Sequence, residues 1–384
     1  MKFVIAPDSF KGCMTAKQAC AAIRDGLLRV FPDAEYVMVP MADGGEGTVR
    51  SLVDATHGRI CSAQVLDPLQ RETVAEYGIL GNANDSGLTA IIEMSAASGI
   101  QFVDEHTRNP LVATTYGTGQ LMKHALDDGV RTIILGVGGS ATNDGGAGMA
   151  EALGVRFLDE HGNPIPRGGG FLDRLATVDM SGLDPRIANT CILIASDVTN
   201  PLVGPTGASA VFGPQKGATP RMVAQLDSNL AHYATVIQTQ LGIEVAHAPG
   251  TGGAGGLGAG LLAFTQSTMR AGVEIVSSIV RLAELAEGAD YCFTGEGGID
   301  FQTKYGKTPM GVAKAVREHN SDIGVIAFAG NVGEGIDQLY DVGIDAVFGI
   351  VSGAMSLDKA IAAGPENLSR AAENVGRLIR IGQR

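Results

Sequence analysis

Five apolar runs of strand length lie near the two ends of the chain, and segments with helical periodicity separate them. The runs cover residues 3–6, 36–39, 291–294, 325–329 and 346–351, and the helical segments cover 16–30, 312–318, 357–363 and the surroundings of 338–340. Almost continuously apolar strands that alternate with helices are typical of a parallel sheet covered on both faces. Five such strands favour a flavodoxin-like, doubly wound α/β domain built from both termini.

The middle of the chain predicts a second α/β domain with a mixed sheet. Strands are expected at 74–80, 89–93, 132–135 and 191–195, with a turn over 81–87, and helices at 119–127, 146–153 and 222–240. We therefore expect a flavodoxin-like domain of residues 1–62 plus 286–384, into which a domain of residues 63–285 is inserted.

Composition excludes several classes of function. The net charge is −13 and the sequence holds no large basic cluster, which argues against nucleic-acid or membrane-surface binding. No apolar run reaches the roughly 20 residues that a membrane span needs. The five cysteines are scattered, without a CxxC pair, and this indicates reduced thiols and a cytoplasmic protein. The sequence does not indicate an oligomeric state.

Glycine is the residue that points to function, because 54 of the 384 residues are glycine, about twice the usual ~7%. Six glycine-containing stretches also carry acid, amide or hydroxyl side chains: 6–12, 42–48, 136–149, 197–217, 249–260 and 294–306. Glycine lets backbone N–H groups approach a ligand closely. Acids beside such loops indicate a bound metal ion or a proton to be moved, so we expect an enzyme that handles phosphate.

The stretch 136–149 (GVGGSATNDGGAGM) lies between a predicted strand and a predicted helix. This geometry directs unpaired N–H groups and the positive helix end at an anion. Asp144 is a candidate cation ligand, and a tight turn capped by Asp144 or Asn143 is the alternative. The candidate phosphate-binding residues are Gly138, Gly139, Ser140, Thr142, Asn143 and Gly145.

Acids also follow the strands of the terminal domain. Asp8, Asp43, Glu296 and Asn331 each come after a predicted strand, so they share one rim if the sheet is parallel. Asp8, Ser9 and Lys11 could contact an anionic substrate, or Asp8 or Ser9 could cap a helix. Asp43 and Glu46 could bind a hydroxyl group or Mg²⁺, or serve only the turn.

Two further segments resemble phosphate or metal sites. Asp197, with Asn200, follows a predicted strand and suits a metal ligand or a general base, with an Asx-turn as the alternative. Residues 306–308 (GKT) do not form a Walker A loop, because position 301 is Phe where that motif needs glycine. Lys307 could contact a phosphate or remain a solvated surface lysine.

Taken together, six motifs resemble the bacterial glycerate kinase family of the glyoxylate and galactarate/glucarate pathways. They are IAPDSFKG (5–12), ADGGEGT (42–48), GVGGSATNDGGAGM (136–149), DVTNPLVGPTGA (197–208), FGPQKGA (212–218) and TGEGGIDFQTKYGKTP (294–309). The resemblance implies ATP-dependent phosphorylation of D-glycerate to 2-phosphoglycerate with Mg²⁺. It also implies a flavodoxin-like domain with an inserted domain and an active site between them. Gly298 departs from the family, which usually has arginine there. Either the arginine is dispensable, or Lys307, Lys11 or Lys216 replaces that cation, or the affinity for the ligand is lower.

On this basis we expect ATP phosphates on loop 136–149, with Glu296 and Lys307 as further phosphate-site residues. Asp144 and Asp197 are the candidate Mg²⁺ ligands. The candidate substrate residues are Asp8, Ser9, Lys11, Glu46 and Arg108, with Lys11 on the glycerate carboxylate. Asp43 or Asp197 would accept the hydroxyl proton. The alternatives are a glycerate 3-kinase, a kinase of a related hydroxy acid, or a non-catalytic ligand-binding homologue.

Overall fold

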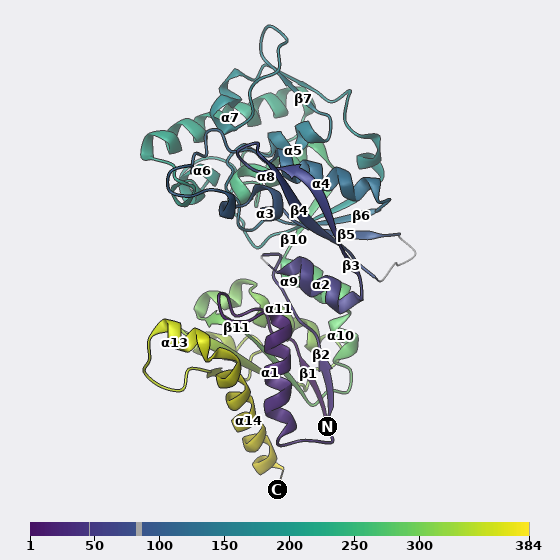
Figure 1. The fold of residues 1–384 in the computed structure, drawn as a ribbon, viewed down its shortest axis with the longest axis vertical. Coiled ribbons are helices and arrows are strands. Elements are labelled where there is room, and N and C mark those ends of the chain that lie inside the picture. Colours follow the sequence, from purple (N-terminus) through teal and green to yellow (C-terminus); the bar gives the residue numbers. More distant parts are fainter. Residues whose placement is uncertain (46, 82–86, 384) are drawn as a thin grey trace. The chain divides into compact units, whose positions relative to one another are not determined.

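The structure is a computed structural model that describes residues 1–45, 47–81 and 87–383. The chain divides into two compact units (Figure 1). Unit 1 consists of Met1–Asp43, Arg50–Thr56 and Ala271–Arg384, and unit 2 of Gly44–Val49 and His57–Arg270. The N-terminal and C-terminal segments thus belong to one unit. The domain limits at 62/63 and 285/286 stay a prediction.

Unit 1 contains a five-stranded sheet in which every neighbouring pair is parallel. Its order is β2-β1-β11-β12-β13, which is the 2-1-3-4-5 order of the flavodoxin-like fold and confirms the predicted fold class. The strands are β1 Lys2–Ile5, β2 Glu35–Met38, β11 Tyr291–Ile299, β12 Gly324–Val332 and β13 Ala346–Gly349. The helices are α1 Ala16–Leu28, α2 Thr48–Thr56 (whose first two residues group with unit 2), α9 Gly272–Ile279, α10 Leu282–Leu285, α11 Thr308–Arg317, α12 Asp337–Tyr340, α13 Leu357–Ala362 and α14 Gly364–Gly382.

Two long helices, α1 and α14, lie side by side in unit 1 (Figure 1). They approach so closely at Gly26 that a Cβ there would lie 2.1 Å from the Ser369 carbonyl oxygen. Helix α1 begins with a capping box formed by Thr15 and Gln18. Thr15 therefore caps α1, and neither Asp8 nor Ser9 does.

Unit 2 contains a six-stranded mixed sheet, as predicted, in the order β10-β9-β6-β5-β4-β3. The strands are β3 Arg59–Leu66, β4 Glu72–Ile79, β5 Thr89–Glu93, β6 Thr132–Gly136, β9 Cys191–Ala195 and β10 Ser267–Arg270, and a separate pair is formed by β7 Arg156–Leu158 and β8 Thr177–Asp179. Strands β10, β9, β6 and β5 run parallel, whereas β4 pairs antiparallel with β5 and β3. Most of the turn predicted over 81–87 lies outside the described residues.

The helices of unit 2 are α3 Ser95–Ser98, α4 Tyr116–Asp127, α5 Ala147–Ala152, α6 Ala208–Phe212, α7 Pro220–Leu241 and α8 Gly253–Phe264. Apolar residues at alternate positions of the central strands and residues of these helices form one core, which includes Ile133, Ile192, Leu230, Tyr233 and Leu257. The core fixes the carboxyl ends of β6 and β9, where the glycine loop and Asp197 follow.

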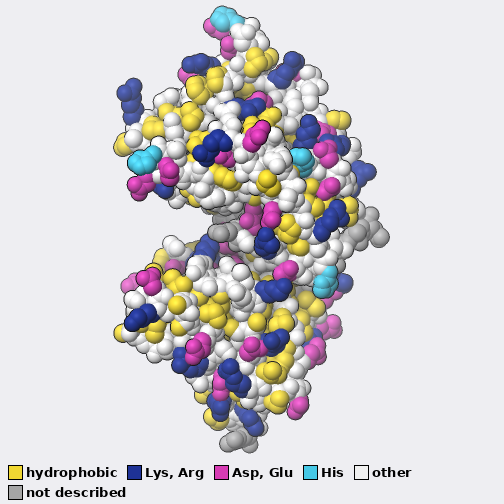
Figure 2. Space-filling model, in the orientation of Figure 1, with side chains coloured by type: hydrophobic (Ala, Val, Ile, Leu, Met, Phe, Trp, Pro, Cys, Tyr) yellow, Lys and Arg dark blue, Asp and Glu magenta, His cyan; other side chains and the backbone are white. Residues whose placement is uncertain are grey.

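The distribution of charged side chains on the surface agrees with the lack of a large basic cluster in the sequence. On the faces that Figure 2 shows, basic and acidic side chains are interspersed over both units and do not gather into one basic area. Within the described ranges, no helix is both long enough and apolar enough to cross a bilayer.

Candidate active site

Asp8 lies at the carboxyl end of β1, at the rim where the parallel sheet predicts a ligand site. Its carboxylate is 8% exposed and accepts hydrogen bonds from the Thr308 hydroxyl at 2.6 Å and the Ser9 backbone N–H at 2.5 Å. Burial, with a smaller contribution from the negative charge of Asp43, raises the pKa of Asp8 to about 6. The charge of Asp43 thus acts on Asp8, and the role of the two carboxylates in one site stays a prediction.

Glu296 belongs to the same acidic group. It lies in β11, and its side chain is 14% exposed. Burial is the main reason why the pKa of Glu296 rises to about 7, and the charges of Asp8 and Asp43 add to the effect. Lys307 opposes it, because its ammonium lies 3.5 Å from Glu296 Oε1. The raised pKa values of Asp8 and Glu296 favour a shared proton at this rim.

Lys307 is therefore not a purely solvated lysine. Besides Glu296, its ammonium donates a hydrogen bond to the Gly298 carbonyl at 3.2 Å and lies 3.8 Å from Asp300 Oδ1. A Cβ at Gly298 would meet no heavy atom closer than the Asn331 carbonyl oxygen at 4.0 Å. The space at Gly298 is open, and Lys307 supplies a positive charge beside it.

The remaining unit 1 candidates have different exposures. Lys11 is exposed, whereas Ser9 and Asp43 are half-buried. Glu46, predicted as a substrate residue, lies outside the described residues. Gly44, which follows Asp43, belongs to unit 2 and packs so that a Cβ there would lie 2.8 Å from the Ala195 Cβ at the end of β9.

In unit 2, the glycine loop after β6 has an accessible first part. Gly138 and Gly139 are exposed and Ser140 is half-buried. These three line a cavity of about 350 Å³, together with Val137 and Lys216 and with Ile100, Val198, Phe212, Gln215 and Ala254. Its size and its glycine backbone suit a phosphate group.

The second part of the loop is buried in unit 2. Thr142, Asn143 and Gly145 are each inaccessible in this structure, although we predicted phosphate contacts for them. Gly145 has φ +65° and would place a Cβ 2.7 Å from the Tyr233 ring, so its lack of a side chain serves packing. Their contact with phosphate stays a prediction, because a ligand would reach them only after rearrangement.

Asp144 is wholly buried and holds two helix starts in place. Its carboxylate accepts hydrogen bonds from the backbone N–H groups of Thr115, Gly146 and Gly148 at 2.8 to 3.2 Å, and from the Thr115 hydroxyl. These donors lie at the N-termini of α4 and α5. Burial raises the pKa of Asp144 and these bonds oppose that rise. The capping role, which was the alternative interpretation, is thus present; the metal role stays a prediction.

Lys216 entered the sequence analysis only as one of three lysines that could replace the family arginine, and the structure places it in the loop cavity. It is 2% exposed, and its ammonium donates a 2.6 Å hydrogen bond to the Thr142 carbonyl. Burial lowers the pKa of Lys216 to about 7, and the Asp144 charge partly opposes this. The motif FGPQKGA has no helical or strand periodicity, so the sequence did not indicate that this lysine is buried.

The two other unit 2 candidates, Asp197 and Arg108, are exposed. Asp197 follows β9, and Asn200 beyond it donates to the Thr206 carbonyl at 2.8 Å. Arg108 lies in a turn in which its N–H donates to the Asp104 carbonyl. Its Cβ would be 2.8 Å from a Cβ at Gly217, so Arg108 is anchored beside the Lys216 segment.

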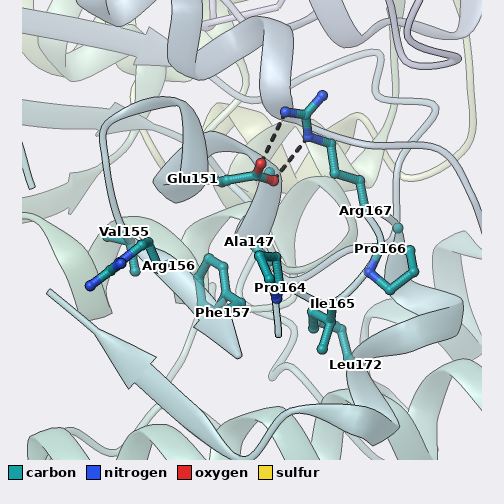
Figure 3. Close-up of a pocket in the computed structure, with 12 residues that line it drawn as sticks. Ala147, Glu151, Val155, Arg156, Phe157, Pro164, Ile165, Pro166, Arg167 and Leu172 are labelled. Atoms are coloured by element: carbon teal, nitrogen blue, oxygen red, sulfur yellow. Dashed lines mark hydrogen bonds and ion pairs between the residues drawn. The ribbon is translucent and has the colours of Figure 1, made fainter. Parts of the chain in front are cut away.

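A second, smaller cavity of about 130 Å³ lies against α5 (Figure 3). Arg167 and Glu151 form a two-bond ion pair at 2.9 Å for each bond, and the Arg167 guanidinium lies 3.5 Å from the centre of the Tyr116 ring. Arg156 also lines this cavity and pairs with Asp179. Because both arginines already have carboxylate partners, this cavity offers an anion less than the loop cavity does.

Mg²⁺ is the metal that the family resemblance implies. No group of three or more His, Cys, Asp or Glu side chains in the described ranges is arranged to hold a metal ion. Mg²⁺ commonly uses only one or two carboxylates, with water and substrate phosphates completing its shell. The exposed carboxylate of Asp197, beside the cavity residue Val198, fits that need; the fully bonded carboxylate of Asp144 fits it poorly.

Comparison with known proteins agrees with this geometry. The model of the glycerate kinase family matches residues 3–380. A glycerate kinase from Halalkalibacterium halodurans is 53% identical over 97% of this chain and 96% of its own length. A glycerate 2-kinase from Escherichia coli is 47% identical over 100% of this chain and 99% of its own. A crystal structure of a glycerate kinase 2 from Salmonella typhimurium LT2 superposes with a TM-score of 0.89 at 47% identity, covering 100% and 99% of the two chains.

The fold, the loop cavity and these matches define a two-unit α/β kinase. The chain belongs to the glycerate kinase family. The resemblance in its six motifs is therefore confirmed.

Proposed function

We propose that this enzyme transfers the γ-phosphoryl group of ATP to the 2-hydroxyl of D-glycerate and forms 2-phosphoglycerate. The observation that carries the proposal is the end-to-end match to relatives named glycerate kinase, one of which is named glycerate 2-kinase. The loop cavity in unit 2 would supply backbone N–H groups for the phosphates. The acidic rim of unit 1 would supply carboxylates for the acceptor.

The phosphate chain would bind at Gly138, Gly139 and Ser140, whose exposed backbone lines the loop cavity. N–H groups that already point at the phosphate site need no reorganisation during the reaction, so they stabilise charge that develops there. Mg²⁺, when bound by Asp197 and phosphate oxygens, would neutralise charge on the transferring group.

The glycerate carboxylate would pair with Lys11, with Arg108 as a second cation, and Asp8 and Ser9 would contact its hydroxyl groups. Lys307 would contact a phosphoryl oxygen and hold Glu296 in place. With these contacts the reaction would take place between the two units, as the family resemblance implies.

The general base would be Asp43 or Asp197. Either carboxylate could accept the proton of the attacking hydroxyl, and phosphoryl transfer otherwise depends on positioning and charge neutralisation. The negative charge of Asp43 contributes to raising the pKa of Asp8 and of Glu296, which favours proton uptake by those two carboxyl groups.

The test is a coupled assay of ADP release with D-glycerate, ATP and Mg²⁺, followed by ³¹P NMR of the product. We expect ADP release that requires D-glycerate and Mg²⁺, and a phosphorus signal split by the single proton on C2. A signal split by the two protons on C3 would show a glycerate 3-kinase. If a related hydroxy acid is a much better substrate than D-glycerate in the same assay, the enzyme has a different acceptor.

We also propose that the protein is cytoplasmic. All five cysteines are free thiols in the structure, in agreement with a reducing compartment. Fractionation of the source cells, with the protein in the soluble cytoplasmic fraction, is the expected result.

A further inference from the structure

The loop cavity of unit 2 contains a single charged side chain. Among the ten described residues that line it, Lys216 is the only one with a charge, and no acid takes part. The other lining groups are the glycine backbone, one serine hydroxyl, one glutamine amide and apolar side chains. In a chain with a net charge of −13, such a wall selects for an anion.

Burying the charged side chain of Lys216 without a ligand costs free energy. Its side chain is almost wholly buried, yet among the described residues its ammonium donates one hydrogen bond, to the Thr142 carbonyl. An ammonium has three donors, so the geometry leaves capacity for a further acceptor. Among the described residues, no carboxylate lies within ion-pair distance of it. Burial disfavours its charged form, and an anion that enters the cavity would restore that form.

We propose that Lys216 binds the phosphate chain of the nucleotide as the fixed cation of the loop cavity. This inference rests on the proposed function for the identity of the ligand. Lys216 would neutralise phosphate oxygens that the N–H groups of Gly138 and Gly139 orient, and its bond to Thr142 would keep the ammonium in place. An exposed lysine would lose side-chain entropy when it binds a phosphate, whereas the side chain of Lys216 is already held in place.

A purely structural role is the competing explanation, in which Lys216 only holds the Thr142 carbonyl. Two substitutions separate the roles. Lys216→Gln removes the charge and keeps a hydrogen-bond donor, whereas Lys216→Met removes both. Lys123→Met is the matched control, because Lys123 is an exposed lysine of α4 in the same unit.

The experiment is calorimetric titration of the intact enzyme with ATP, inorganic tripolyphosphate and 2-phosphoglycerate, with thermal unfolding of each ligand-free variant. We expect both Lys216 variants to bind ATP and tripolyphosphate at least roughly tenfold more weakly, as for loss of one charged hydrogen bond. Their KM for D-glycerate should stay within about twofold, and Lys123→Met should match the wild type. Since a buried charge is removed, the ligand-free melting temperature should not fall for Lys216→Gln.

Each other outcome has a definite meaning. If Lys216→Gln binds ATP and tripolyphosphate as the wild type does, the inference is wrong, whatever its stability. If only 2-phosphoglycerate binding is lost, Lys216 serves the product and the inference is also wrong. If a Lys216 variant does not fold, the structural role is the correct one. A wild type that binds tripolyphosphate through Lys216 but does not phosphorylate D-glycerate would contradict the proposed function and leave this inference intact.

Discussion

Glu296 shows how much the surroundings of one side chain control its charge. Its pKa rises from 4.5 to about 7, and Asp8 beside it reaches about 6. A carboxyl group whose pKa is raised on folding stabilises the fold below its unfolded pKa, and this stabilisation is lost as the pH rises through the folded value. For Glu296 the shift corresponds to roughly 3 kcal/mol over the range from about pH 4.5 to pH 7.

We therefore expect Glu296→Gln to stabilise the ligand-free, metal-free enzyme relative to the wild type increasingly as the pH rises. The difference in the free energy of unfolding should grow by roughly 2 to 3 kcal/mol between pH 5 and pH 8. Urea unfolding at several pH values measures it. The exposed Glu318→Gln is the control and should change the difference by less than about 0.5 kcal/mol. A constant difference for Glu296→Gln would show that its pKa is not raised.

Asp43 and Asp197 are the residues on which the proposed chemistry depends. Asp43→Asn and Asp197→Asn should each lower kcat by ~10²-fold or more if the residue is the base or the metal ligand. Steady-state assays with D-glycerate and ATP measure the loss. Asp173→Asn, at an exposed position of unit 2, should keep the wild-type kcat. A variant with a normal kcat removes that aspartate from the assignment.

Lys11 should act on binding more than on the chemical step. Lys11→Ala should raise KM for D-glycerate by roughly tenfold or more, as expected for a lost charged hydrogen bond, and should leave KM for ATP nearly unchanged. Lys17→Ala is the control, because Lys17 is an exposed lysine of α1 that pairs with Asp54. An unchanged KM for D-glycerate would remove Lys11 from the substrate site.

At the scale of elements, the packing of α8 against the glycine loop fixes the loop cavity. A Cβ at Gly260 would lie 2.7 Å from the Gly145 carbonyl oxygen and 2.9 Å from the Gly146 Cα. Both neighbours are backbone, so they cannot move as a flexible side chain would. The helix is glycine-rich because the loop backbone packs directly against it.

Gly260→Ala should thus destabilise the enzyme by about 1 to 3 kcal/mol through overpacking. Gly253→Ala in the same helix is the control: its Cβ would meet nothing closer than 3.7 Å, so its effect should stay below about 1 kcal/mol. Thermal or urea unfolding gives both values. Equal effects at the two positions would mean that α8 can shift away from the loop.

The sequence predicted most elements of both sheets because period and apolarity determine them. Strands β5 and β9 have the predicted limits, and α1 starts at the predicted residue. The edge strand β3 was missed because only Ala63 and Val65 in it are buried, so its pattern is weak. Helix α14 was also missed, although Leu368, Ala372 and Val375 mark a buried face that its sequence could have shown.

The candidate site was less predictable. The sequence found the acids at the rim, since strand ends are readable from apolar runs. It could not separate the exposed Gly138–Ser140 part of the loop from the buried part around Asn143, because both consist of the same residue types. The burial of Lys216 depends on loops that meet only in the folded unit, and no local pattern encodes that.

At the scale of the whole molecule, the two units have separate hydrophobic cores. We expect tripolyphosphate to slow amide hydrogen exchange in residues 137–141 and 213–217, and to leave the parallel sheet of unit 1 unchanged. At 100 times its dissociation constant it should stabilise the binding unit by about 2.7 kcal/mol. Exchange measured by mass spectrometry with sulfate as the control ion tests this. Protection confined to unit 1 would contradict the assignment of the phosphate site.

The strand order of unit 1 has a consequence for how the protein is made. Phe3 in β1 pairs with Tyr291 in β11, so one edge of the first strand stays unpaired until β11 is synthesised, roughly 290 residues later. At ribosomal rates of about 5–20 residues per second this wait lasts roughly 15 to 60 s. Nearly all of unit 2 emerges in the meantime as one continuous stretch. The nascent chain can therefore complete its inserted half while an apolar strand remains exposed, which makes the first forty residues the part most in need of a chaperone.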